Sequence, residues 1–154
     1  EQRVHKTYQA IAPYRPELGF PREHHSRMQE SGHFIRMHEV AGPPNSHTRL
    51  TLLEHNPHWA RYQLEPISGK RHQLRVHMAA LGIGILGDGL YPEVNDAPEG
   101  DFSRPLRLLA QAITFTDPLT QQQRHFHSQY TLGALPPEPA PSGQQTWQGL
   151  PANA

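Results

Sequence analysis

The sequence has 154 residues, a length that suits one domain and is sufficient to bury a hydrophobic core. It contains no cysteine, which excludes disulfides and thiolate metal sites and fits a reducing cytoplasm, and no apolar run approaches the roughly 18 residues that a membrane span needs. The 14 basic and 14 acidic residues balance, so the net charge gives no support for a nucleic-acid partner, although a local basic patch would still serve.

The N-terminal half is predicted to be rich in strands. Residues 4–11 alternate between two sets of side chains, which predicts a strand, whereas residues 12–32 are rich in proline, glycine, arginine and histidine and predict a long loop. Three strand-like runs follow at residues 34–40, 48–54 and 59–66. In the last run Ala60, Tyr62 and Leu64 alternate with polar residues, which is typical of a half-buried antiparallel sheet.

The period then changes to that of a helix, which is predicted at residues 70–81. Leu74 and Met78 fall four residues apart and begin an apolar face. Arg71 and Arg75, also four apart, are predicted to share another face.

Capping and turn residues complete the outline of the chain. Ser68 is the predicted N-cap of the helix and Gly82 its terminating glycine. Residues 106–116 and 123–132 predict two strands joined by a turn at 117–120. Mainly antiparallel or mixed strands with one clear helix indicate an α+β domain over residues 1–134, and the proline-rich residues 135–154 are predicted to be a mobile tail.

The most informative motif is S-G-K-R-H-Q-L-R-V-H-M-A-A-L-G-I-G-I-L-G-D-G-L-Y at residues 68–91. It places three basic residues and two histidines around the predicted start of the helix. The N–H groups at a helix N-terminus suit phosphate, and arginines there can hold an RNA backbone or pair with a buried carboxylate. A solvated amphipathic helix is the alternative, and the residues alone leave both readings open.

This motif resembles the pattern T-G-R-x-H-Q-[IL]-R-V-H-x-x-x-x-G-x-P-I-x-G-D-x-x-Y of RluA-type pseudouridine synthases. Ser68, Lys70 and Gly84 replace the threonine, arginine and proline of the family, and lysine lacks the bidentate fork of arginine. Residues 6–10 (K-T-Y-Q-A) resemble the K-x-Y-x-A strand of the family, and residues 106–110 (L-R-L-L-A) partly resemble its L-x-L-H-A strand. The resemblance extends over roughly residues 3–131.

The resemblance implies the pseudouridine synthase catalytic fold and an isomerase that converts uridine to pseudouridine in RNA without a cofactor or metal. It implies that Tyr8 packs on the flipped base and that Arg75 pairs with the catalytic aspartate and keeps it ionised. Leu74 and Leu86 are expected to line the pocket.

The same resemblance implies an RNA partner and a role in RNA modification, with ribosomal RNA favoured over transfer RNA and rRNA processing as the expected context. The residues expected to bind RNA phosphate are Lys70, Arg71 and His72. No membrane or protein partner is indicated, and a cytoplasmic location is expected.

The catalytic aspartate of the family lies in an H-R-L-D-x-x-[TS]-S-G segment that this sequence does not contain. We therefore expect the chain to be a fragment that begins inside a longer protein and is inactive alone. Arg75 is expected to lack its carboxylate partner, which would make the fragment less stable. Asp88 is interpreted as a turn residue, and Asp96, Asp101 and Asp117 as loop residues.

Two other function classes compete with the enzyme. A non-catalytic RNA-binding module derived from the synthase fold would retain the basic helix without the aspartate. A histidine-based metal protein would need three or four converging histidines, and the pairs His24-His25 and His125/His127 show no zinc-like spacing, so no metal site is predicted.

Overall fold

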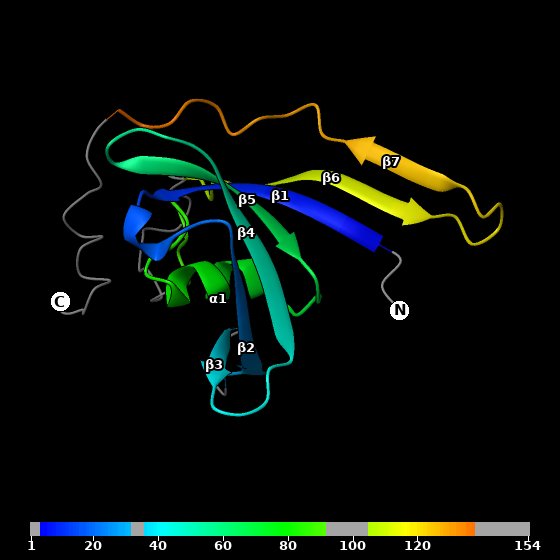
Figure 1. Cartoon of the computed structure of the whole chain (residues 1–154), viewed down its shortest axis with the longest axis horizontal. Helices are drawn as coiled ribbons and strands as arrows, with labels where there is room; N and C mark the ends of the chain where they lie inside the picture. The colour runs from blue at the N-terminus through cyan, green and yellow to red at the C-terminus, as the bar shows by residue number, and fades with distance from the viewer. Residues whose placement is uncertain (1–3, 32–35, 92–104, 138–154) are drawn as a thin grey trace.

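The computed structural model describes residues 4–31, 36–91 and 105–137, which form one antiparallel sheet with a helix packed on one face (Figure 1). The strands follow the order β3-β2-β4-β5-β1-β6-β7, and every pair is antiparallel. The predicted α+β class is confirmed, with an antiparallel rather than a mixed sheet in the described part. The elements are β1 (Val4–Pro13), the 3-10 helix η1 (Pro16–Leu18), β2 (Arg22–Glu30), β3 (Met37–Val40), β4 (Ser46–His55), β5 (Trp59–Pro66), α1 (Gln73–Ala80), β6 (Leu108–Thr116) and β7 (Gln123–His127).

Most of the predicted strands are confirmed. β5 has the predicted bounds, and β1 and β4 extend one or two residues beyond theirs. β3 covers the last four residues of the predicted run 34–40, of which residues 34–35 lie outside the described part. β6 begins two residues later than predicted, and β7 ends at His127 instead of residue 132.

The long loop predicted at residues 12–32 is wrong, because this segment contains η1 and β2. β2 pairs with β4 through Arg22↔Leu50 and with β3 through Glu30↔Met37. The side chains of β2 alternate between half-buried and exposed from Arg22 to Arg27. The inward-facing side chains include His24 and Ser26, which make hydrogen bonds, so the strand carries little apolar signal.

The helix α1 begins three residues later than predicted. Its N-cap is His72, which has a left-handed φ of 58° that interrupts the helical backbone. The prediction of Ser68 as N-cap is therefore wrong, and Arg71 precedes the helix instead of sharing a face with Arg75. Gly82 is confirmed as the terminating glycine, with φ 82° and a 3.0 Å hydrogen bond from its N–H to a helix carbonyl.

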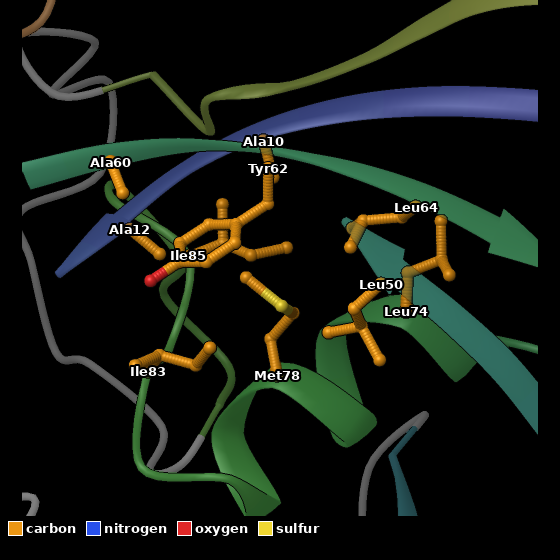
Figure 2. Close-up of a cluster of buried hydrophobic side chains, with 10 residues drawn as sticks. All are labelled: Ala10, Ala12, Leu50, Ala60, Tyr62, Leu64, Leu74, Met78, Ile83 and Ile85. Carbon is orange, nitrogen blue, oxygen red and sulfur yellow. The ribbon is translucent and has the colours of Figure 1, made fainter. Parts of the chain in front are cut away.

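The core lies between α1 and the middle of the sheet. Figure 2 shows side chains of β1, β4 and β5 pointing toward α1 and the loop that follows it. Alanines 10, 12 and 60 leave room for Met78 and Ile85, all of which are fully or almost fully buried. The buried Tyr62 hydroxyl donates to the Pro13 carbonyl at 2.7 Å, and burial raises the pKa of this phenol.

The last two strands form a hairpin beyond the helix. The predicted turn at 117–120 is confirmed, since the Asp117 carboxylate accepts the backbone N–H groups of Leu119 (2.8 Å) and Thr120 (3.5 Å). The tail residues 138–154, including Trp147, lie outside the described part, so the division at residue 134 stays a prediction. In the described residues, no helix has the length and apolar character to cross a membrane.

Candidate active site

A cavity of about 280 Å³ opens on the helix-bearing face of the sheet, at the start of α1. It is bounded by β1, the loop between β5 and α1, the first turn of α1 and the start of β6. Its volume lies near the lower end of the range of roughly 300–1,000 Å³ for small-molecule pockets. A site of this size suits one flat ring better than a large ligand.

Tyr8 enters the cavity from the middle of β1. It pairs with Leu64 of β5 on one side and Ala110 of β6 on the other. The register between β1 and β6 shifts at this point, because Thr7 pairs with Ala112 whereas Tyr8 pairs with Ala110. Gln111 of β6 is therefore an extra residue without a partner in β1, which marks a bulge. Bulges twist a strand and re-aim its side chains, and they are frequent beside active sites.

The buried side chain of Gln73 fixes the loop that forms the cavity wall. Its Nε2 donates to the His47 carbonyl and to Thr48 Oγ1, both at 2.9 Å. Its Oε1 accepts from Ser68 Oγ at 2.8 Å and from the Lys70 N–H at 3.1 Å. All four hydrogen-bonding positions of the amide are used, so the loop is tied to β4 and to the helix start.

Arg75 forms a bidentate ion pair with Asp88. Its Nε lies 3.0 Å from Oδ2 and its Nη2 2.7 Å from Oδ1. The Asp88 side chain is fully buried and also accepts the N–H groups of Leu90 (2.9 Å) and Tyr91 (3.1 Å). Arg75 is therefore not left unpaired, although the expected lack of the catalytic aspartate stays a prediction. The interpretation of Asp88 as a turn residue agrees with these backbone contacts.

The ion pair leaves part of the Arg75 guanidinium available. Its side chain is 18% exposed and lines the cavity. Among the described residues no acceptor binds Nη1, so this nitrogen can donate to a second anion. Tyr91 lies against the same cation, with its ring centroid 5.4 Å from Cζ of Arg75.

His72 also contributes to the wall of the cavity. Its Nδ1 lies 2.8 Å from the Tyr91 hydroxyl, which in turn accepts the Met37 N–H at 2.8 Å. Burial, followed by the positive charges of Arg75 and Arg71, holds the pKa of His72 below its ordinary value of 6.5. The lowered pKa favours the neutral imidazole at pH 7, which can offer a hydrogen bond rather than a charge.

Five of the seven predicted site residues line this cavity: Tyr8, Lys70, His72, Leu74 and Arg75. Arg71 does not, because its Nη2 pairs with the Glu30 carboxylate at 3.1 Å near the end of β2. Leu86 is also not among the lining residues. Its backbone N–H donates to the Ile11 carbonyl (2.8 Å), and its carbonyl accepts the Arg107 N–H (2.9 Å).

Lys6 and Leu108 line the cavity without having been predicted. Lys6 precedes Tyr8 by two residues, so the strand period alone could have placed both on one face. Leu108 pairs with Ala10 across β1 and β6, which only the register reveals. A second cavity of about 310 Å³ shares Lys6 and Tyr8 and extends along the β6–β7 hairpin to Phe126.

The remaining acidic and histidine candidates lie elsewhere. Asp117 caps the hairpin turn, and Asp96 and Asp101 lie outside the described residues. His24 and His25 belong to β2 instead of a loop, which brings them near other histidines of the fold.

Comparison with known proteins identifies the family of this chain. A family model described as "RNA pseudouridylate synthase" matches residues 1–80. The chain is 40% identical over 83 residues to the dual-specificity RNA pseudouridine synthase RluA of Haemophilus influenzae, a match that covers 53% of this chain and 36% of the relative. It is 35% identical over 91 residues to the mouse RNA pseudouridylate synthase domain-containing protein 1, covering 56% of this chain and 28% of that protein.

The fold has a counterpart among solved structures. The human RNA pseudouridylate synthase domain containing 1 superposes with a TM-score of 0.65 at 25% identity, over 82% of this chain and 54% of that chain. The chain spans about a third of the length of the curated relatives that it matches. These matches confirm the resemblance that the motif at residues 68–91 indicated.

Proposed function

Because this chain belongs to the RNA pseudouridylate synthase family and is of the RluA type, we propose that it forms part of an enzyme that isomerises uridine to pseudouridine in RNA. The observation that carries the proposal is the cavity in which Tyr8, Leu74 and Arg75 meet. The parent protein's activity is inferred, since the matched relatives are about three times longer than the aligned part.

Tyr8 and the apolar wall would bind the target base. Turning a uridine out of the RNA stack costs a few kcal/mol, and stacking on an aromatic ring returns about 1–3 kcal/mol per base. Leu74 and Leu108 line the same cavity and supply apolar contact. The Tyr8 hydroxyl would then be placed to take part in removal of the proton from C5 of the base.

Arg75 would hold the catalytic carboxylate. Asp88 binds Nε and Nη2 and so orients the guanidinium, while Nη1 stays available for a second anion. We propose that the second anion is the family's catalytic aspartate, contributed from outside these 154 residues. Asp88 itself is fully buried and accepts hydrogen bonds from Arg75 and two backbone N–H groups, which suits a positioning role rather than direct attack.

Lys70 and His72 would meet the RNA backbone at the cavity. Arg71 makes a smaller contribution in this proposal, because Glu30 already neutralises its charge. Replacing Lys70 by alanine should lower the slope of log K against log salt by about 0.7–0.9, whereas Arg71→Ala should change it less. Ribosomal RNA remains the favoured substrate over transfer RNA, and a cytoplasmic location remains a prediction.

The central test is an isomerisation assay on uridine-containing RNA, with pseudouridine measured after digestion to nucleosides. We expect no product from the 154-residue chain and product from the longer protein expected to contain it. In that protein Tyr8→Phe should keep RNA binding and lower turnover by about 10²–10⁴-fold if the phenol transfers a proton. Tyr130→Phe, which alters a tyrosine that is 77% exposed, is the matched control.

A non-catalytic RNA-binding module is the second candidate, favoured by the lack of an H-R-L-D segment in the sequence. RNA binding by the longer protein without pseudouridine formation would select it. Turnover by the 154-residue chain alone would instead show that catalysis does not require an aspartate from outside the chain.

A further inference from the structure

Three side chains that are distant in the sequence gather on the inner side of β2. They are His24 on β2, Glu39 on β3 and His77 on α1. The Glu39 Oε2 atom lies 2.6 Å from Nε2 of His24 and 3.9 Å from Nε2 of His77. All three ligand atoms fall within 4.8 Å of one another, so one ion could contact all of them.

The cluster is sheltered but reachable from solvent. The His77 side chain is fully buried, whereas those of His24 and Glu39 are 17% and 27% exposed. Among the residues that the structure describes, no lysine or arginine forms an ion pair with Glu39. The site therefore combines an entry path with a carboxylate whose charge is not already neutralised by a permanent cation.

The other ring nitrogen of His77 is held from behind. Its Nδ1 lies 2.8 Å from Thr48 Oγ1, which matches the outer hydrogen bond that metal-binding histidines usually make. This contact leaves Nε2, the ring nitrogen that faces Glu39, as the atom that would bind an ion.

Two serine hydroxyls lie beside Nε2 of His77, and their hydrogen bonds to this nitrogen would have to be given up when it binds a metal ion. Ser26 Oγ and Ser46 Oγ lie 3.1 Å and 3.0 Å from this nitrogen. The Ser46 hydroxyl donates to the Ser26 carbonyl at 2.7 Å, so its hydrogen is engaged. The Ser26 hydroxyl can turn to Ser46 Oγ, 3.2 Å away, and no hydroxyl is left without a partner.

From this arrangement we propose that His24, Glu39 and His77 form a binding site for one divalent transition-metal ion, with zinc as the best match. Two imidazoles and a carboxylate are ligands that zinc accepts at about 2.0–2.2 Å. In a tetrahedral site such ligand atoms lie about 3.3 Å apart, between the two distances seen to Glu39. A bound ion would tie β2 and β3 to α1, and its fourth position is open to solvent or an exogenous ligand.

A second cluster on the outer side of β2 provides an internal control. Glu23, His25 and His47 also bring their ligand atoms within 4.8 Å of one another, but Glu23 and His25 are exposed. Arg49 Nε lies 3.4 Å from the Glu23 carboxylate, and this guanidinium opposes a bound cation. The inner cluster should therefore bind the ion more tightly than the outer one.

The test is a titration of the chelator-treated protein with Zn²⁺ alone. Calorimetry measures the binding, and thermal unfolding measures the stabilisation that binding causes. We expect one tight equivalent and, at a free concentration near 100 times Kd, a rise in Tm of roughly 5 °C or more. His24→Gln and Glu39→Gln should each weaken Zn²⁺ binding by more than about 100-fold. Mutating a residue that only hydrogen-bonds to a metal ligand already lowers metal affinity by about 10–100-fold. His25→Gln, in the outer cluster, should leave the tight equivalent unchanged.

Circular dichroism of each metal-free variant establishes that the fold is retained, so that lost binding reports on the ligands. X-ray absorption of the zinc-loaded protein should show two imidazoles in the first coordination sphere. The proposal is overturned if the unmodified protein takes up no tight equivalent, if Glu39→Gln binds as well as the parent, or if His25→Gln removes the tight equivalent.

Discussion

The centre of the sheet and its β7 edge differ sharply in burial. In β5, beneath which α1 packs, Trp59, Tyr62 and Leu64 are at most 2% exposed. In β7 all five residues are exposed, and Phe126 reaches 57%. Figure 1 shows the helix on the side of β4 and β5, with the β6–β7 hairpin extending beyond it. Burial in this sheet is thus decided by what covers a face rather than by the strand itself.

The candidate active site lies at the border between these regions. The two cavities share Lys6 and Tyr8, one extending toward α1 and the other along the hairpin. A base bound at Tyr8 would be enclosed on the covered side, while the rest of an RNA chain would pass over the open side. In the proposed function, the covered region would hold the base and the open region would face the rest of the RNA.

The largest effect is expected at the border itself, from Arg75→Ala. The substitution leaves the Asp88 carboxylate fully buried without its guanidinium partner, which should lower the free energy of unfolding by about 3–5 kcal/mol. Urea denaturation measures this change. The matched control is Arg71→Ala, because the Arg71–Glu30 pair is exposed and such pairs contribute about 0–1 kcal/mol.

A double-mutant cycle separates the pair from its neighbours. The variant that carries both Arg75→Ala and Asp88→Ala should be less destabilised than the sum of the two single variants, since no buried charge is left unpaired. Additive losses would mean that the two side chains act independently and that the border is not organised by this ion pair.

Leu50→Ala probes the interior of the covered region. Leu50 is fully buried between the sheet and α1, so the substitution should cost roughly 2–5 kcal/mol through lost burial and a residual cavity. Leu119→Ala in the hairpin turn alters a side chain that is 91% exposed and should change stability by no more than about 0.5 kcal/mol. Equal losses in thermal or urea unfolding would contradict the contrast between the two regions.

The parts of the fold that follow a simple hydrophobic period could be predicted from the sequence. The predicted bounds of β5 match the structure, because Ala60, Tyr62 and Leu64 alternate with polar residues on a strand that has one buried face. β2 was missed because His24 and Ser26 occupy its inner face and are satisfied by hydrogen bonds. A polar inner face depends on partners from other elements, which no local pattern contains.

The candidate site shows the same limit. Lys70 and Arg75 of the motif at residues 68–91 both line the cavity, and their predicted roles stay predictions, but the motif gave no sign that Arg71 turns to Glu30. The backbone contacts of Asp88 could be anticipated as a turn, whereas its ion pair with Arg75 depends on how the loop after α1 folds back. Residue types and their spacing therefore suggest candidate residues, and the tertiary fold decides which partners those residues contact.

Phe126→Ala tests whether the open region contributes to function more than to stability. The ring stacks beside Phe115 with centroids 6.0 Å apart, and such cross-strand pairs contribute about 0.2–1 kcal/mol. We expect a loss of stability of at most about 1 kcal/mol and a clear loss of RNA affinity, because Phe126 lines the second cavity. An unchanged affinity, measured by fluorescence anisotropy with a labelled RNA, would restrict binding to the cavity beside α1.

The smallest expected effect is a difference in how the two regions respond to acid. The pKa of His72 in the folded protein is below its ordinary value of 6.5, so its neutral form is favoured by folding. Its contribution to stability is complete above pH 6.5 and is lost as the pH falls toward the lowered pKa. His72→Asn removes this titration and tolerates the left-handed φ of 58°, so the parent should lose stability relative to the variant below pH 6.5.

The hairpin should respond only at lower pH. Hydrogen bonds from the Leu119 backbone N–H, and then those from Thr120 and Arg124, keep the pKa of Asp117 below its ordinary value of 3.8. Its contribution is present above pH 3.8 and is lost as the pH falls through the lowered pKa, so the stability difference between the parent and Asp117→Asn should stay constant from pH 7 to about pH 5. Urea denaturation measures both stability differences, parent against His72→Asn and parent against Asp117→Asn. If the two differences changed over the same pH range, the assignment of His72 to the higher range and Asp117 to the lower range would be contradicted.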